Sequence, residues 1–328
     1  MDRRAFVAAL ASGMLAAPRS ARAQPAAAKP VGVGVLRAAP DAPLFRQNAE
    51  RFLQALRENG FVEGTNLAVE FRVRAGRTED MAVLAAELVR LRMDGILAVG
   101  PAAVQAAAGA TKAIPIVAMD LESDPVAAGF ATSLARPGKN VTGVFLDFPE
   151  LSGKWIQLLR ELVPKLARIA AIWDPSTPAN LLRGAETAAR TLRVELFPLE
   201  ALTAEDFAPA FRSAADKRVD ALMVLSSPVF YSARPQIVAG AARHRLPTIM
   251  PFPEFADHGG LIAYGPNVPA MFRQAGEVMV KVLRGTRPGD IPLELPARFE
   301  LSVNRKTAAS LGLTVPHSLL VRADRVVE

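Results

Sequence analysis

Cysteine is absent from this chain, and histidine nearly so. Without cysteine the chain forms no disulfide, offers no thiol nucleophile and supplies no thiolate ligand to a metal. The histidines, His244, His258 and His317, stand far apart with no pairing at ligand spacing, so no metal site is expected. A chain of 328 residues buries enough apolar surface to fold without disulfides.

Blocks of basic residues are also missing. Lysine and arginine total 39 against 32 aspartates and glutamates, which gives a formal net charge of +7. Several of the arginines fall in the N-terminal segment 1–23, so the rest of the chain carries a smaller surplus, spread along its length. Binding to nucleic acid needs a concentrated basic patch, so we expect no nucleic-acid partner.

The first 23 residues are typical of an export signal rather than of a fold element. Arg3 and Arg4 precede the uncharged run Ala5–Ala17, and Ala21-Arg22-Ala23 forms a small-x-small cleavage site before Gln24. The run is shorter than the ~20 residues that span a bilayer. The paired arginines favour the twin-arginine route, with ordinary Sec export as the alternative. We therefore expect the signal to be cleaved and the mature protein to work in the periplasm.

Beyond this segment, short β-branched runs alternate with longer helical patterns. Such alternation is typical of βαβ units and parallel sheets. The expected strands lie at 31–36, 67–73, 96–99, 114–119, 141–146, 169–173, 194–198, 221–225, 248–249 and 261–264. The expected helices lie at 44–58, 78–91, 102–112, 150–162, 179–192, 203–215, 233–244 and 269–283. The two similar sets join near residue 147, which predicts an α/β fold of two lobes with a cleft between them.

Four segments carry a resemblance to a known family: NGFVEGTNLAVEFR (59–72), SDPVAAGFATSLARPGKNVTGV (123–144), HGGLIAYGPN (258–267) and the tail 283–328. With them the chain resembles the ABC-transporter substrate-binding family that includes tryptophan-type binding lipoproteins, relatives of type I periplasmic binding proteins. The resemblance covers nearly the whole chain. It implies two Rossmann-like lobes with parallel sheets, a hinge of three crossing strands, and a ligand held between the lobes.

This resemblance also implies how the chain is divided. After the signal peptide, residues 1–23, the N-terminal lobe is expected to comprise 24–147 and 260–288. The C-terminal lobe is expected to comprise 148–259 and 289–328. Some relatives carry a lipid-anchor cysteine, and because this chain has no cysteine we expect it to be free in the periplasm.

Ligands of open α/β sheets bind beyond the carboxyl ends of the strands, where helix N-termini present free backbone N–H groups. The residues at those positions form the predicted binding site. In the first lobe they are Arg37, Ala38, Gly100, Pro101, Ala102 and Asp120. In the second lobe they are Trp173, Asp174, Ser226, Ser227, Phe230, Phe252, Glu254 and Tyr264.

The aromatic members of this set predict a planar or aromatic ligand. Trp173, Phe252 and Tyr264 would form an aromatic wall, although Trp173 and Phe252 could equally be core residues. Tyr231 lies at the same strand end as Phe230.

The charged members predict polar ends on that ligand. Asp120, Asp174 or Glu254 could hold an amine, while Asp174, followed by proline, also fits a helix N-cap. Arg37 could hold a carboxylate through a bidentate pair. The family often has a small polar residue near 37–38, whereas this chain has Arg37 followed by two alanines. Aromatic acids and nucleoside-like compounds are therefore candidate ligands beside aromatic amino acids.

These observations favour a non-enzymatic periplasmic solute-binding protein of an ABC importer. It would take a small molecule between its lobes, close by bending at a hinge near Asp147, and present the closed form to an ABC permease in the inner membrane. We expect a monomer with no cofactor, no metal and no catalytic residue. The alternatives are a ligand sensor for a membrane kinase and an enzyme on the same frame, for which the sequence supplies no nucleophile, metal cluster or phosphate loop.

We predict that the mature N-terminus is Gln24, because the small-x-small site ends at Ala23. N-terminal sequencing of protein recovered from the periplasm checks this. Changing Arg3→Lys together with Arg4→Lys should block export by the twin-arginine route and leave folding intact. An exported, functional protein that keeps Met1 would contradict the signal assignment.

Overall fold

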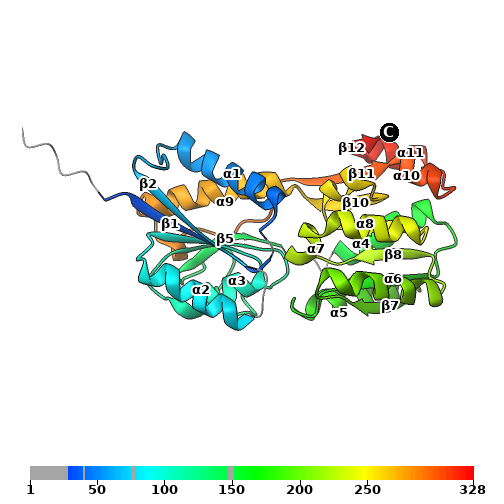
Figure 1. The fold of residues 1–328 in the computed structure, drawn as a ribbon, viewed down its shortest axis with the longest axis horizontal. Helices are drawn as coiled ribbons and strands as arrows, with labels where there is room; N and C mark the ends of the chain where they lie inside the picture. Colours follow the sequence, from blue (N-terminus) through cyan, green and yellow to red (C-terminus); the bar gives the residue numbers. More distant parts are fainter. Residues whose placement is uncertain (1–28, 40, 75–77, 147–150) are drawn as a thin grey trace, which may run out of the picture. The chain divides into compact units, whose positions relative to one another are not determined.

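Two β-sheets, each covered by helices on both faces, make up the fold (Figure 1). The computed structural model describes residues 29–39, 41–74, 78–146 and 151–328. The expected signal peptide and the expected hinge at Asp147 lie outside the described residues. Val31–Glu328 forms one compact unit that contains both sheets.

The first sheet has five parallel strands in the order β2-β1-β3-β4-β5. Its strands are β1 (Val31–Arg37), β2 (Leu67–Val73), β3 (Gly95–Val99), β4 (Ile116–Asp120) and β5 (Val141–Phe145). One face packs against α1 (Pro43–Glu58) and α9 (Val268–Leu283), and the other against α2 (Thr78–Arg90) and α3 (Pro101–Ala110) (Figure 1). Because both faces are covered, the central strands β1, β3 and β4 are apolar except for the charged residues that end β1 and β4, Arg37 and Asp120.

The second sheet has seven strands in the order β12-β11-β10-β9-β8-β6-β7. They are β6 (Arg168–Trp173), β7 (Glu195–Glu200), β8 (Ala221–Val224), β9 (Thr248–Met250), β10 (Ile262–Pro266), β11 (Phe299–Asn304) and β12 (Arg325–Val327). All its neighbours are parallel except β10 and β11, which are antiparallel. The expected α/β class is confirmed, with this one antiparallel pair as the departure from purely parallel sheets.

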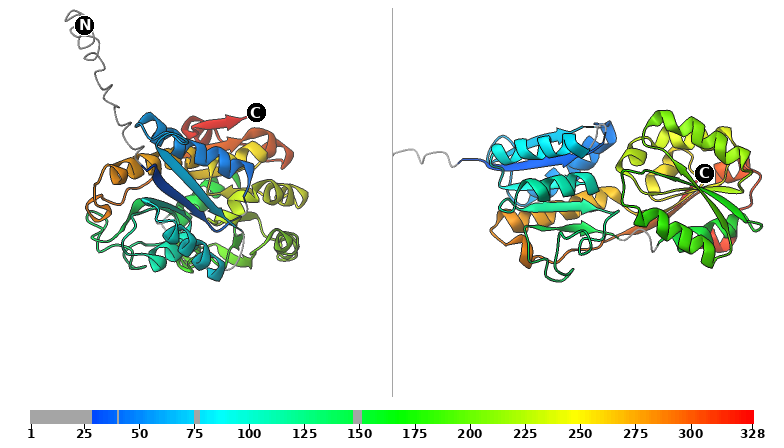
Figure 2. Two further views of the ribbon diagram at one scale, coloured as in Figure 1. Left: turned by 60° about the vertical axis from the view of Figure 1, so that its left-hand side comes forward. Right: turned by 90° about the horizontal axis from the view of Figure 1, so that it is seen from below.

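Helices cover the second sheet as well (Figure 2). They are α4 (Ser152–Leu162), α5 (Asn180–Thr191), α6 (Phe207–Asp216), α7 (Pro228–Ser232), α8 (Arg234–Arg243), α10 (Arg305–Ser310) and α11 (His317–Arg322). Three 3₁₀ turns, η2 (Ala204–Asp206), η3 (Pro253–His258) and η4 (Pro288–Asp290), complete the described elements. The helix α7 follows β8 and lies at the carboxyl end of that strand, where it meets the first lobe.

The chain changes lobes around α9. The strand β10 pairs with β9 and β11 in the second sheet, whereas α9, which follows it, packs against α1 on the first sheet. After α9, the Glu294 N–H donates a hydrogen bond to the carbonyl of Gly143 in β5 of the first sheet (2.9 Å). The chain then returns to the second sheet with β11. The expected boundary at residue 260 places β10 in the first lobe, whereas its hydrogen bonds to β9 and β11 place it in the second sheet. A five-residue strand pattern does not reveal its partners, because they are distant in sequence.

The packing of α1 on α9 brings together two helices that are far apart in sequence. On α1 the residues Phe45, Ala49, Phe52 and Leu56 share one buried face at helical spacing. On α9 the residue facing them is Gly276, and a Cβ there would lie 2.7 Å from the Phe52 carbonyl oxygen and from the Ala55 Cβ. The glycine therefore allows the two helix backbones to approach closely.

We predict that Gly276→Ala lowers the free energy of unfolding by about 1–3 kcal/mol, the usual cost of overpacking a filled contact. The matched control is Gly109→Ala in α3, where a new Cβ meets nothing within 4 Å. That change should be neutral or slightly stabilising, since alanine favours a helix over glycine. Urea unfolding of both variants checks the prediction, and equal effects at the two sites would contradict it.

Candidate functional site

A cavity lies where the strand ends of the first sheet meet α7. Its volume is about 60 Å³, well below the roughly 300–1,000 Å³ of most small-molecule sites, so a solute larger than a few waters enters only if the walls move apart. Both lobes contribute to the lining, which is mostly apolar: Arg37, Phe45, Asn48, Val99, Gly100, Met119, Leu121, Glu122, Ser227, Pro228, Tyr231, Phe252, Val268, Met271 and Phe272.

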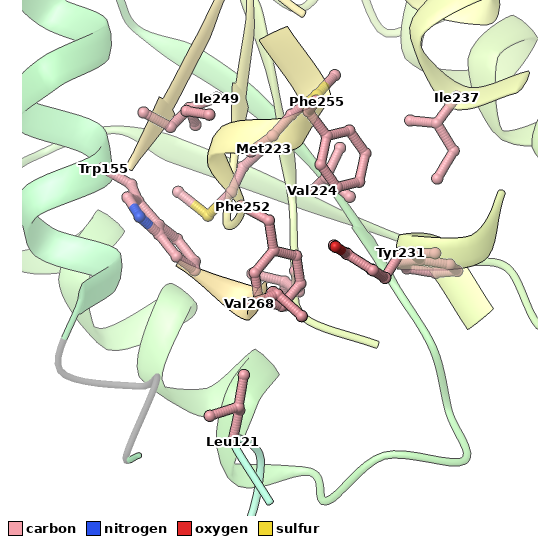
Figure 3. Packing of buried hydrophobic residues seen from close by; sticks show 14 of the residues in the cluster. Leu121, Trp155, Met223, Val224, Tyr231, Ile237, Ile249, Phe252, Phe255 and Val268 are labelled. Atoms are coloured by element: carbon pink, nitrogen blue, oxygen red, sulfur yellow. The ribbon is translucent and has the colours of Figure 1, made fainter. Parts of the chain in front are cut away.

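Four aromatic side chains form the walls of this cavity. Phe45 of α1 and Phe272 of α9 meet edge to face with ring centres 6.0 Å apart. Tyr231 of α7 and Phe252, which precedes η3, meet edge to face at 5.0 Å (Figure 3). One pair comes from each lobe, so a flat solute between the lobes would contact aromatic rings from both.

Arg37 is the one basic side chain among the described residues of this lining. It ends β1, is 3% exposed, and its Nη2 donates to the Pro228 carbonyl (3.2 Å) and to Ser232 Oγ (2.8 Å). Its guanidinium carbon lies 4.5 Å from the centre of the Phe45 ring. Burial lowers the pKa of Arg37 to about 10, so the group stays charged at neutral pH. The side chain therefore joins the first lobe to α7 as a buried cation.

Of the lining residues that the structure describes, Glu122 alone is acidic. It follows β4, and its Oε1 accepts a hydrogen bond from Ser226 Oγ of the second lobe at 2.5 Å. Burial raises the pKa of Glu122, and the neighbouring Asp120 carboxylate raises it further. Asp120 is itself fully buried; its Oδ1 accepts from the N–H groups of Glu122 and Ser123, each at 3.0 Å, and burial raises its pKa too.

The short helix α7 is held in place from both lobes. Ser227 caps it by accepting from the Val229 N–H (3.0 Å), and donates its own hydroxyl proton to Asp174 Oδ2 (2.6 Å). Asn48 Nδ2 of α1 donates to the Tyr231 hydroxyl at 3.1 Å. Burial raises the pKa of Tyr231, so this hydroxyl stays protonated.

Gly100 sits opposite this helix. Its φ of +88° suits glycine, and a Cβ there would lie 2.8 Å from Pro228 Cγ. The close approach of β3 and α7 therefore depends on the absence of a side chain.

The structure places about half of the predicted site residues at this cavity. Arg37, Gly100, Ser227 and Phe252 line it. Three more are buried directly behind the lining and bonded to it: Asp120, Asp174 and Ser226.

The other predicted residues lie elsewhere in the described part of the chain: Ala38, Pro101, Ala102, Trp173, Phe230, Glu254 and Tyr264. Ala38 and Ala102 pack on the α2–α3 side of the first lobe. Phe230 points into the second lobe against Phe207. The centre of the Tyr264 ring lies 6.2 Å from the centre of the Phe299 ring. The Tyr264 backbone carbonyl accepts a hydrogen bond from Trp155 Nε1. Strand-end position selected these residues but did not reveal the direction of each side chain.

Sequence reasoning missed the helix faces that complete the cavity. Phe45 and Asn48 come from α1, and Val268, Met271 and Phe272 from α9, neither of which follows the strand-end rule. Glu122 and Tyr231 lie within two residues of predicted ones, and Tyr231 is one of the aromatic residues at the strand ends. The remaining missed residues are Val99, Met119, Leu121 and Pro228.

Neither a metal centre nor a membrane span is found among the described residues. No group of three or more His, Asp or Glu side chains there could hold a metal ion. Within the same residues, every helix is too short or too polar to cross a bilayer.

Comparison with known proteins yields consistent matches. The family model described as ABC transporter substrate binding protein matches residues 41–327. A tyrosine-binding protein of Clostridioides difficile is 28% identical over 273 residues, which cover 83% of this chain and 78% of that protein.

Solved structures agree in fold. A conserved domain protein from Vibrio cholerae is 25% identical with a TM-score of 0.83, covering 91% of this chain and all of that one. An ABC domain from Streptococcus pneumonia, solved in complex with L-Trp, is 23% identical with a TM-score of 0.82 and the same coverage.

We predict that Glu122 makes the protein less stable as pH rises. The folded state raises the pKa of this carboxyl above its usual 4.5, so the folded state binds its proton more tightly than the unfolded state does. The free energy of unfolding should therefore fall as pH increases upward from 4.5. Glu122→Gln removes the titrating carboxyl and with it this loss of stability. The free energy of unfolding of the variant minus that of the wild type should therefore increase between pH 5 and 8.

Urea unfolding at several pH values measures that difference. The exposed Glu205 provides a matched control as Glu205→Gln, whose curve should run parallel to that of the wild type. Parallel curves for Glu122→Gln as well would show that Glu122 keeps an ordinary pKa.

Proposed function

The chain belongs to the ABC transporter substrate-binding protein family, and we propose that it binds an aromatic amino acid or a related aromatic solute in the cavity at α7. The observation that carries this proposal is the composition of the lining. Aromatic rings from both lobes face the cavity, together with one buried cation, Arg37, and one buried carboxyl, Glu122. A solute with a ring and ionic groups at one end matches these features. The tyrosine-binding relative and the L-Trp complex support the same ligand class.

Ligand capture would proceed by closure of the two lobes. Hydrogen bonds between described residues join the lobes at Arg37 and α7, at Asn48 and Tyr231, and at Ser226 and Glu122. Each is made only when the lobes are together. A ligand that touches both walls adds contacts to this closed state and shifts the equilibrium toward it.

The family membership also supports the remaining parts of the proposal. We propose that the protein is exported through its N-terminal signal, works as a periplasmic monomer, and delivers its ligand to an ABC permease in the inner membrane. The closed lobes would present a surface to the permease that the open lobes do not. Binding and release, with no chemical change in the ligand, would be its whole cycle.

Thermal shift followed by calorimetry tests this function. The probes are L-tyrosine, L-tryptophan and L-phenylalanine, with L-leucine and L-lysine as non-aromatic controls. A ligand at 100 times its Kd stabilises the native state by ~2.7 kcal/mol, which gives a measurable rise in melting temperature. We expect at least one aromatic probe to raise it and the controls to leave it unchanged. Stabilisation by the controls alone would contradict the proposed ligand class.

We predict that Phe45→Leu weakens binding of the best aromatic probe by about tenfold, or ~1.4 kcal/mol, because the Phe45 ring is part of the cavity wall. The matched control is Phe52→Leu on the same face of α1, where the side chain is fully buried and outside the lining. Both changes should lower the melting temperature, but Phe52→Leu should keep the wild-type Kd. Equal losses of affinity would place the ligand elsewhere.

A further inference from the structure

We propose that the second lobe binds an anionic membrane surface through the edge of its sheet at which the parallel strands begin. This inference goes beyond the proposed function and rests on it only for the setting, because a protein that delivers a ligand to a permease works beside a membrane. Four segments, which lead into β6, β7, β8 and β9, form the edge: 163–168, 190–195, 216–221 and 243–248. We call them the basic edge.

The topology of the sheet brings these segments together. The strands β9, β8, β6 and β7 are neighbours in that order and all parallel, so the four begin at the same edge. At about 4.8 Å between neighbouring strands, their first residues span about 14 Å. In the sequence, at least one helix separates each segment from the next. Their charges are therefore concentrated only in the folded chain.

The basic edge carries a large positive surplus. Among the described residues, Arg168 is the one basic member that forms an ion pair, with Glu195 at 3.4 Å. The Asp220 carboxylate already accepts from the N–H groups of Ala167 and Arg168, each 2.8 Å away. All the basic members are exposed except Arg168, which is half-buried. The basic members are Lys165, Arg168, Arg190, Arg193, Lys217, Arg218, Arg243 and Arg245, against the acidic Glu195, Asp216 and Asp220.

Two of these cations lie close to one aromatic ring. The guanidinium carbon of Arg168 lies 4.9 Å from the centre of the Phe197 ring on β7, and Lys217 Nζ lies 5.1 Å from the same centre. The ring attracts both cations, but the two like charges repel each other. A phosphate group placed beside the pair would relieve that repulsion.

Three arginines of the basic edge occupy a backbone position that glycine usually takes. Arg193, Arg218 and Arg245 follow the ends of α5, α6 and α8 with φ of +55°, +50° and +52°. Helices often end in this left-handed conformation, and glycine is favoured there because it has no Cβ. Each of these positions nevertheless carries a long, exposed cation.

The composition of the basic edge favours a layer of phosphate headgroups over the surface of a folded protein. Protein interfaces have an apolar core in which charged residues are depleted. In the described chain, none of the exposed large apolar side chains belongs to the four segments. Clusters of about four to eight lysines and arginines are typical of segments that bind anionic lipid.

A competing role for these residues is to stabilise the helices that they follow. Basic side chains near a helix C-terminus offset the partial negative charge there. Helix stabilisation changes the melting temperature and creates no affinity for lipid. Measuring both quantities on the same variant therefore separates the two roles.

Sedimentation with lipid vesicles tests the proposal on the full mature protein. The probes are vesicles of phosphatidylcholine alone and vesicles of phosphatidylcholine mixed with an equal part of phosphatidylglycerol. At ~0.1 M salt we expect the wild type to bind the mixed vesicles at least ~10-fold more strongly than the neutral ones. Binding should be lost at ~1 M salt, where the screening length falls to ~3 Å.

The variant that combines Arg193→Gly, Arg218→Gly and Arg245→Gly removes three charges from the basic edge. Because glycine adopts these backbone conformations without strain, we expect the variant to fold. It should bind the mixed vesicles at least ~10-fold more weakly than the wild type does. Its Kd for the best aromatic probe, measured by calorimetry, should equal that of the wild type.

The matched control combines Arg51→Gln, Arg92→Gly and Arg287→Gln. It removes the same number of exposed charges from positions outside the basic edge. Arg92 shares the left-handed backbone, with φ of +54°. The control should bind the mixed vesicles as the wild type does.

Each outcome decides the assignment. Equal binding to neutral and mixed vesicles, or equal losses in the variant and the control, overturns it. A variant that melts earlier but binds the mixed vesicles like the wild type leaves helix stabilisation as the role. Tighter binding to poly-L-glutamate than to the mixed vesicles, lost in the same variant, assigns the edge to an acidic protein instead. Failure of vesicle binding leaves aromatic binding standing, and failure of every aromatic probe leaves the membrane assignment standing.

Discussion

The meeting of α7 with the first lobe is the contact on which the cavity depends. A helix of five residues is too short to be stable by itself. Ser227 fixes its start by capping the first turn and bonding Asp174, so that the helix is anchored to its own lobe. The Pro228 carbonyl and the Ser232 hydroxyl of this helix accept hydrogen bonds from Arg37. Its Tyr231 hydroxyl accepts a hydrogen bond from Asn48. Remove these contacts, and the aromatic walls of the two lobes no longer face one another.

The two buried charges at the cavity are held in different ways. Arg37 has acceptors on α7 and the face of the Phe45 ring to offset its desolvation, so it remains a cation. Glu122 is surrounded by a hydroxyl, a backbone N–H and other carboxyl groups, and these compensate its charge poorly. The first lobe therefore brings to one apolar space a stabilised cation and a carboxyl group whose raised pKa favours its protonated form.

Strand-end reasoning selected those lining residues of the candidate cavity that lie at or just after strand ends. Arg37, Gly100, Ser227 and Phe252 line the cavity because the carboxyl ends of parallel strands gather at one edge of each sheet. It could not find Phe45 on α1 or the α9 residues, since helical periodicity shows that a face is buried without showing what it is buried against. It also selected Tyr264, whose ring packs against Phe299 instead, because alternation along a strand does not say which face meets the cavity.

The sequence by itself determined the alternation of strands and helices, the absence of disulfides and thiol chemistry, and the grouping of the chain into two α/β sets. These follow from composition and from patterns within about ten residues of chain, where propensity and periodicity act. Only the tertiary structure decided that β10 joins the second sheet while α9 covers the first, and that Arg37 meets α7 across 191 residues of sequence. Those pairings arise from long-range packing and hydrogen bonding, whose partners leave no local mark in the chain.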